Sequence, residues 1–141
     1  MNNSRAWSKR AGEIARSYLS NIDELAGRRE NSRMRRSIAA RKNRGISKPV
    51  ENEALRIAAD QRIAELEREV EAVEWAFSIL RTMRGGEEIA NVAAALYITK
   101  DRVSVDRVAF EQHMNRATAF RHNRIFLKLV AAKMGIWAPP L

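Results

Sequence analysis

The residues best suited to chemistry lie in a cationic stretch near the C-terminus of the 141-residue chain. If this stretch is helical, Arg121, Arg124 and Lys128 fall on one side, at about 100° per residue. Guanidinium groups bind phosphates and guanine edges, so this side is suited to a polyanion. The residues predicted to contact nucleic acid are Arg116, Ala117, Thr118, Phe120, Arg121, His122, Arg124 and Lys128.

Catalytic and metal-binding chemistry have no counterpart in the sequence. There is no cysteine, and neither His113 nor His122 has a cluster of acids beside it, so a zinc site would lack ligands. The sequence holds no Walker-type phosphate loop and no nucleophile next to a base. We therefore expect a non-enzyme that uses no cofactor and no metal.

Two helices joined by a short turn are predicted to present the cationic side. Ser104 is suited to cap the first helix, with Asp106 in its first turn, where the helix dipole favours an acid. Asn115 is the expected cap of the second helix, and Val108 and Ala109 are expected to face inward from the first. This order is typical of a helix-turn-helix, whose second helix enters the DNA major groove.

The opposite side of the second helix is apolar. Ala119, Phe126 and Val130 share one face, which predicts packing on a core. Ile125 and Leu129 form a second apolar strip. We expect another helix or another subunit to cover that strip.

Two longer helices are predicted upstream. Residues 4–26 carry an apolar stripe at four-three spacing and are expected to end at Gly27. Residues 50–84 start after Pro49 and carry a heptad seam. The seam consists of Ala59, Ile63, Leu66, Val70, Val73, Phe77 and Leu80.

The seam is too long for a small core to cover from one side. We expect the first helix to cover part of it, and pairing with a second copy as a homodimer is left open. The acids between 65 and 74 lie mostly off the seam, and we interpret them as a solvated face. They are Glu65, Glu67, Glu69, Glu71 and Glu74.

Charge is unevenly distributed along the chain, whose net charge is +9. Residues 1–50 hold 13 Lys and Arg against 4 acids, residues 51–90 hold 5 against 10, and residues 91–141 hold 8 against 3. Two basic ends separated by an acidic segment suggest two surfaces for a polyanion. Residues 28–48 are interpreted either as a solvated linker or as an arm that binds a nucleic-acid backbone. The predicted arm residues are Arg33, Arg35, Arg36, Arg41, Lys42 and Arg44.

The expected fold is all-α, with long helices and a C-terminal helix-turn-helix. We divide the chain into an N-terminal helix and basic arm (1–49), a long connecting helix (50–84) and a helix-turn-helix domain (85–141). Gly85-Gly86 separates the long helix from a further apolar helix over residues 87–98. No apolar run approaches the roughly 20 residues that span a bilayer, and no signal peptide is recognisable, so we expect a cytoplasmic protein without a membrane partner.

The sequence resembles the RinA/ArpU family of phage transcriptional regulators. The family pattern Ser-Arg-x-Thr-aromatic-Arg-x-Arg is matched by Arg116, Thr118, Phe120, Arg121 and Arg124, with Asn115 in place of the usual Ser. Weaker matches are the segments 49–56 and 66–74, whereas Gly85-Gly86 replaces the family's frequent Leu-Pro. The resemblance implies a C-terminal module similar to region 4 of sigma factors, which is expected to contact a promoter, with RNA polymerase as a further expected partner.

We therefore predict a sequence-specific activator of phage late genes in the bacterial host, with double-stranded DNA as its partner and RNA polymerase as a further one. Arg121 and Arg124 are the expected base or phosphate contacts, and the backbone contacts are expected from Arg116, Thr118 and Lys128. One alternative is a DNA-packaging recognition protein of the small-terminase type. The other is an RNA-binding or antitermination factor that uses residues 28–48 as an arginine-rich arm.

Overall fold

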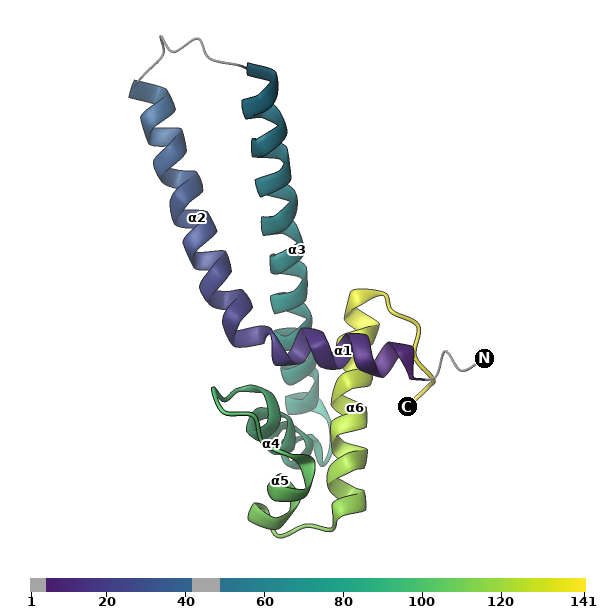
Figure 1. Cartoon of the computed structure of the whole chain (residues 1–141). Helices are drawn as coiled ribbons and strands as arrows, with labels where there is room; N and C mark the ends of the chain where they lie inside the picture. The colour runs from purple at the N-terminus through teal and green to yellow at the C-terminus, as the bar shows by residue number, and fades with distance from the viewer. Residues whose placement is uncertain (1–4, 42–48) are drawn as a thin grey trace.

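The computed structural model describes residues 5–41 and 49–141, with the backbone alone at 39–41 and 49–51. This part of the chain is all-helical, which confirms the predicted fold class, and it holds six α-helices (Figure 1). The resemblance to region 4 of sigma factors remains a prediction. The helices are α1 (Ala6–Arg16), α2 (Tyr18–Arg41), α3 (Pro49–Thr82), α4 (Gly86–Tyr97), α5 (Val105–Glu111) and α6 (Arg116–Met134).

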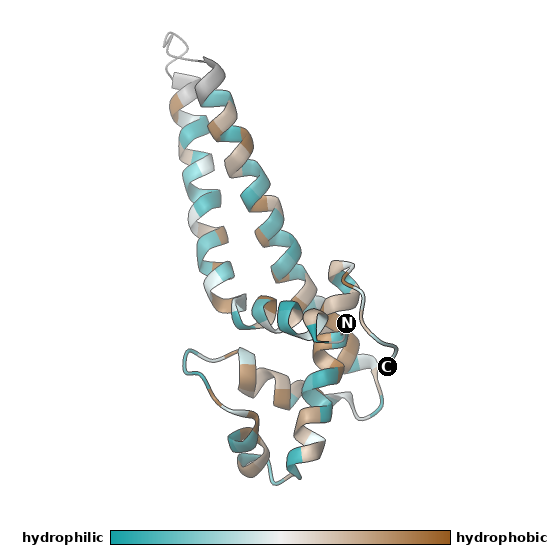
Figure 2. Ribbon diagram, turned by 45° about the vertical axis from the view of Figure 1, so that its right-hand side comes forward, coloured by the Kyte–Doolittle hydropathy of each residue, from teal (hydrophilic) through white to brown (hydrophobic). Residues whose placement is uncertain are grey.

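The helices form a compact body with a long hairpin that projects from it. Figure 1 shows α2 and the N-terminal part of α3 side by side in the hairpin, whereas α1, α4 and α6 pack against the C-terminal part of α3 and α5 packs on α4 and α6. At about 1.5 Å per residue, the 34 residues of α3 extend roughly 50 Å. The hairpin is largely hydrophilic, with separated hydrophobic positions, as Figure 2 shows. A single helix therefore belongs to both the body and the hairpin.

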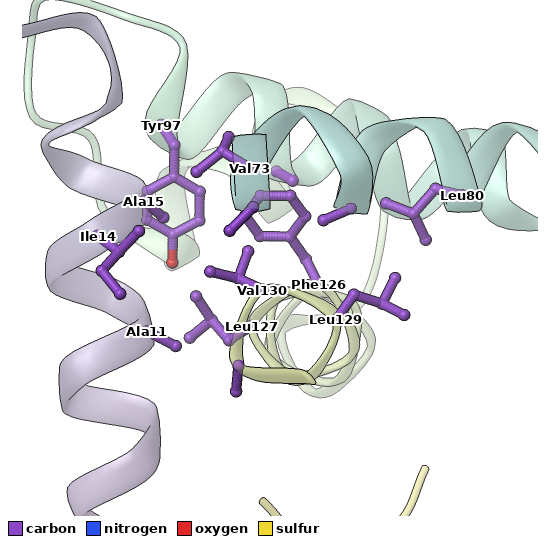
Figure 3. Packing of buried hydrophobic residues seen from close by; sticks show 14 of the residues in the cluster. Ala11, Ile14, Ala15, Val73, Leu80, Tyr97, Phe126, Leu127, Leu129 and Val130 are labelled. Atoms are coloured by element: carbon purple, nitrogen blue, oxygen red, sulfur yellow. The ribbon is translucent and has the colours of Figure 1, made fainter. Parts of the chain in front are cut away.

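The core of the body is built around α6, which contacts α1, α3, α4 and α5. Phe126 is fully buried, and Figure 3 shows it beside Tyr97 of α4. Its ring lies 5.5 Å from that of Tyr97 and 5.0 Å from that of Phe77 on α3. Ile14 of α1 and Val130 of α6 lie in the same cluster. Aromatic pairs at such distances stabilise the fold by about 0.5–1.5 kcal/mol each beyond the effect of area burial. Through these two contacts Phe126 joins α6 to α3 and α4.

The heptad seam of α3 is filled within one chain over most of its length. Leu66 and Val70 pack with Leu25 of α2, and Val73 and Leu80 belong to the main core. The two N-terminal seam residues, Ala59 and Ile63, are half-buried. The expectation that an N-terminal helix covers part of the seam is therefore confirmed. A homodimer through the seam remains a prediction, and residues 66–80 of the seam are already covered.

The prediction of one helix over residues 4–26, ending at Gly27, is wrong. α1 ends at Arg16, Ser17 adopts φ −85° and ψ 0°, and α2 then continues without interruption through Gly27. The apolar stripe keeps its register across Ser17 because both helices bury it, α1 against α6 and α2 against α3. A change of direction that preserves the register leaves no trace in the hydrophobic pattern, and neither Gly nor Pro marks it.

The arginine-rich segment is helical over residues 28–41, as part of α2, and residues 42–48 lie outside the described residues. The interpretation of the whole segment as a linker is therefore wrong for its first part. Acids balance part of the charge of this helical part: Arg29 lies 3.3 Å from Glu67 of α3, and Arg33 lies 3.6 Å from Glu30.

The acids of α3 are less uniformly solvated than predicted. Four of the five are exposed, but Glu69 is only 7% exposed and its carboxylate lies 3.4 Å from the guanidinium of Arg10 on α1. The exposed Glu74 accepts a hydrogen bond of 3.1 Å from the Tyr18 hydroxyl. The acidic helix thus supplies counter-charges and acceptors to α1 and α2.

Glu24, an acid of α2, is bound by two arginines. Arg62 of α3 donates to both of its carboxylate oxygens, at 3.0 and 3.1 Å, and Arg28 donates to one of them at 2.7 Å. These hydrogen bonds, from Arg62 first and Arg28 second, lower the pKa of Glu24 from 4.5 to about 2. Glu24 therefore ties α2 to α3.

The connection between α3 and α4 requires glycine. Gly85 has φ +74°, in the left-handed region, and the Gly86 amide donates to the Met83 carbonyl at 3.0 Å. A Cβ on Gly86 would lie 1.8 Å from the carbonyl oxygen of Leu80, a backbone atom that no side-chain rotation can move. This close approach allows α4 to fold back at once against α3.

We expect Gly27→Ala and Gly86→Ala to have opposite effects on the free energy of unfolding. Gly27 lies within a continuous helix with nothing within 4 Å of an added Cβ, so alanine should stabilise by about 0.5–1 kcal/mol. Gly86→Ala should destabilise by about 3 kcal/mol or more, because backbone must move. Urea titrations followed by circular dichroism measure both. A destabilising Gly27→Ala would contradict the continuity of α2.

Acid should weaken the hairpin through Glu24. Its folded pKa lies below its unfolded pKa, so the stabilisation is fully present above about pH 4.5 and is lost as the pH falls toward 2. We expect the difference in Tm between the wild type and Glu24→Gln to shrink over this interval. Asp60→Asn, which removes one exposed carboxylate from α3, is the matched control. A difference in Tm that stays constant from pH 7 to pH 2 would contradict the ion pair.

Candidate nucleic-acid interface

Both predicted helix caps at the C-terminal pair of helices are confirmed. The Ser104 hydroxyl accepts a hydrogen bond from the Arg107 amide at 3.2 Å, and the Asn115 side chain accepts from the Ala117 amide at 2.9 Å. Val108 and Ala109 of α5 are buried, as expected. Local side chains therefore fix where α5 and α6 begin.

The turn between α5 and α6 is short and defined. His113 has φ +55°, the Met114 amide donates to the Ala109 carbonyl at 3.0 Å, and the His113 amide donates to the Phe110 carbonyl at 3.3 Å. This pair of bonds around a left-handed residue is a Schellman motif, in which glycine is the usual residue. Four residues, 112–115, thus separate two helices that pack on each other.

The N-terminal half of α6 exposes one stripe of side chains, which we call the arginine face and define as Ala117, Phe120, Arg121 and Arg124. The intervals of three, one and three residues place all four on the same side of the helix. Phe120 is 44% exposed, which is unusual for an aromatic residue beside a buried core. The opposite side is buried at Ala119 and Phe126. The helix is therefore two-sided, as the sequence predicts.

Other predicted contact residues lie differently. Arg116 is exposed, but its guanidinium lies 2.6 Å from the Asp106 carboxylate and 5.1 Å from the centre of the Phe120 ring. Thr118 and His122 are half-buried, and His122 Nδ1 is buried with no hydrogen-bond partner in the described part of the chain. Thr118 and His122 therefore lie off the arginine face. The arginine face includes fewer residues than were predicted to contact nucleic acid.

Lys128 is engaged by the C-terminal segment. Its ammonium donates to the Pro140 carbonyl at 2.6 Å, so the segment after α6 folds back along the helix. Ile136 and Ala138 of that segment pack against the main core, whereas Trp137 is 68% exposed. Lys128 therefore lies at the end of the arginine face with one of its donors already used.

Asn123 interrupts the apolar side of α6, and Tyr97 explains why it is tolerated. The Tyr97 hydroxyl donates to the Asn123 side-chain oxygen at 2.5 Å. Burial raises the pKa of Tyr97, while the charge of Arg16 and the hydrogen bond to Asn123 act in the opposite direction. The pair therefore joins α4 to α6.

The structure adds a second cationic element that the sequence reasoning missed. A surface groove of about 760 Å³ lies along the junction of α1 and α6, and Trp7 and Tyr97 contribute to its lining. Trp7 is buried, and its ring lies 5.4 Å from the Arg124 guanidinium. The groove also carries five cations and one acid, namely Arg5, Lys9, Arg16, Arg121, Arg124 and Glu13.

The sequence contains little signal for this groove. Residues 5–16 and 121–124 are more than 100 positions apart, and the stripe of α1 predicts core packing, which is observed for Trp7 and Ile14. The available signal is that the exposed side of α1 is basic, with Lys9 and Arg16 among its charges. The packing of α1 on α6 brings these charges next to Arg121 and Arg124, and the sequence pattern does not show that packing.

The predicted basic arm lies elsewhere, on the hairpin. Arg33, Arg35 and Arg36 are exposed on α2, and Arg41 is its last residue. Lys42 and Arg44 lie outside the described residues. The structure therefore does not place these arginines at the groove.

Within residues 5–41 and 49–141, no cluster of three or more His, Cys, Asp or Glu side chains is arranged to hold a metal ion. No helix in the same ranges combines the length and apolarity needed to cross a membrane. No protein-family model, curated protein or solved structure matches this chain. The resemblance to the RinA/ArpU regulators thus stays a prediction made from the sequence.

Proposed function

We propose that this chain is a sequence-specific DNA-binding transcriptional regulator. In this proposal α5 and α6 act as a helix-turn-helix, and the N-terminal half of α6 enters the major groove of duplex DNA. The observation that carries the proposal is the arginine face: an exposed cationic stripe at the start of a helix whose other side is locked into a core.

The dimensions of α6 support this assignment. The arginine face extends over eight residues, or roughly 12 Å, which is about the width of the major groove. Arg121 lies in the first two turns, where recognition helices contact base edges. Among the described residues it has no ion-pair partner, so its guanidinium is available for a guanine.

The biological setting of the proposal comes from the resemblance to the RinA/ArpU regulators. It supports binding at the promoters of phage late genes in the cytoplasm of the bacterial host, with activation through RNA polymerase. The proposed regulator is not an enzyme and acts without cofactor or metal.

Removing the guanidinium of Arg121 should reduce sequence discrimination more than overall binding. The target would first be selected by the wild type from a pool of randomised duplexes, and affinity would then be compared for the selected and a scrambled duplex. Since one bidentate arginine–guanine contact discriminates by about 1–3 kcal/mol, Arg121→Ala should lower the preference roughly 5- to 150-fold. Fluorescence anisotropy on both duplexes measures this preference.

Lys133→Ala is the matched control on the same helix. Lys133 lies toward α3, with its ammonium 5.7 Å from the Trp75 ring and 4.0 Å from the Glu71 carboxylate. The substitution Lys133→Ala removes one positive charge at a place away from the arginine face, so the preference for the selected duplex should be retained. Full preference in Arg121→Ala would refute the role of Arg121, and a wild type that selects no sequence would refute the proposed function.

A DNA-packaging recognition protein is the second candidate function, favoured by the far end of the hairpin. Met34 and Ile38 of α2 and Leu55 and Ile57 of α3 are each about half exposed. Exposed apolar residues on a projecting element are typical of assembly surfaces. In a small-terminase-type ring, this end of the hairpin would contact neighbouring subunits.

Light scattering on the purified protein separates the two candidates. One or two chains of 16.1 kDa support the regulator, whereas a closed ring of about eight to twelve chains supports packaging. If the hairpin mediates assembly, Leu55→Gln should shift either oligomer toward the monomer, because Leu55 is 62% exposed and does not support the core. Ala64→Gln, at an exposed position of α3 with no large apolar side chain, is the control.

A further inference from the structure

The groove between α1 and α6 has the composition of a phosphate-binding surface. Its lining carries five cations and one acid, and Glu13, the acid, lies 4.0 Å from Arg10 outside the lining. None of the five cations has an ion-pair partner in the described part of the chain. Like charges this close repel one another in the free protein, so the surface favours an anionic ligand.

We propose that α1 is a second DNA-contacting element. Its Arg5, Lys9 and Arg16 bind the phosphate backbone beside the DNA major groove that α6 enters. This inference rests on the proposed function, because it takes the DNA to be docked on the arginine face. It assigns a ligand to a helix whose other side is buried in the core at Trp7, Ala11 and Ile14.

The position of α1 relative to α6 determines which part of the DNA it meets. α1 packs against α6 where Arg124 reaches Trp7, about 12 Å along the helix from Arg116. The major groove is about 12 Å wide. When the first turns of α6 contact base edges, the part of α6 that packs on α1 therefore lies at the edge of the major groove. Phosphates line that edge, and contacts to them fix position without reading sequence.

Trp7 connects the two cationic elements. The Arg124 guanidinium lies over its ring at 5.4 Å, a distance within the range of a cation–π interaction. The indole is 2% exposed and its Nε1 has no hydrogen-bond partner in the described structure, so the ring acts here through packing and its π face. It holds Arg124 between α1 and α6 before any ligand arrives, which reduces the entropy lost on binding.

The test combines two substitutions on the exposed side of α1, Lys9→Ala and Arg16→Ala. Each lost phosphate contact should reduce the slope of log affinity against log salt by about 0.9, so the double variant should lose about 2 from the slope. Affinity at 100 mM salt should fall by roughly tenfold or more, and equally for the selected and the scrambled duplex. Anisotropy titrations between 50 and 200 mM salt provide both values.

Two controls isolate the location of the charge. Arg56→Ala combined with Arg68→Ala also removes two positive charges, but from exposed positions of α3 on the hairpin. This variant should leave the affinity and the slope of log affinity against log salt unchanged. Lys9→Glu changes a single exposed side chain, so it tests the same surface even if the double variant folds poorly. It should weaken binding further than Lys9→Ala does.

The outcomes distinguish this inference from the proposed function. An unchanged slope and affinity in the α1 variants, with sequence preference lost in Arg121→Ala, would overturn the inference and leave the proposed function standing. A loss confined to the selected duplex would also overturn it, because α1 would then read bases. A wild type that binds no duplex would overturn both.

Discussion

The structure depends on the burial of Phe126 between Phe77 and Tyr97. This contact holds α6 against α3 and α4 at once, and α1 packs on the same helix from another side. Because the core packs around α6, the helix that carries the exposed side chains of its N-terminal half is held in one position. The cost is that α6 carries little freedom to adapt: Asn123 is accommodated only through the Tyr97 hydroxyl, and His122 leaves a buried nitrogen unpaired among the described residues.

The hairpin is stabilised differently from the body. Its apolar contacts are few, with Leu25, Leu66 and Val70 as the buried cluster, and ion pairs such as Glu24 with Arg62 add to them. Exposed ion pairs are individually weak and are screened by salt. The hairpin should therefore respond to ionic strength and pH more strongly than the body. Its basic and acidic helices also neutralise each other in part, as in the pair of Arg29 with Glu67.

Local signals made much of the fold predictable. The caps at Ser104 and Asn115, the break at Gly85-Gly86 and the seam of α3 all depend on residues close together in sequence, and each is observed. The bend at Ser17 was missed because the apolar register continues across it. The helical state of residues 28–41 was missed because the acids that pair with Arg28 and Arg29 include Glu67, which is distant in sequence.

The candidate site was predictable only in part, for the same reason. The exposure of Ala117, Arg121 and Arg124 follows from helical periodicity. The pairing of Arg116 with Asp106 and the contact of Lys128 with Pro140 depend on how separate segments meet. The cations of α1 become part of the site only through packing between the two ends of the chain.

The continuity of α3 has a mechanical consequence. One uninterrupted helix extends from beside Phe126 to the far end of the hairpin. A rotation of the hairpin is therefore transmitted to the body through the backbone of α3. A macromolecule that grips the far end therefore sets the orientation of α6 from several nanometres away, without touching it.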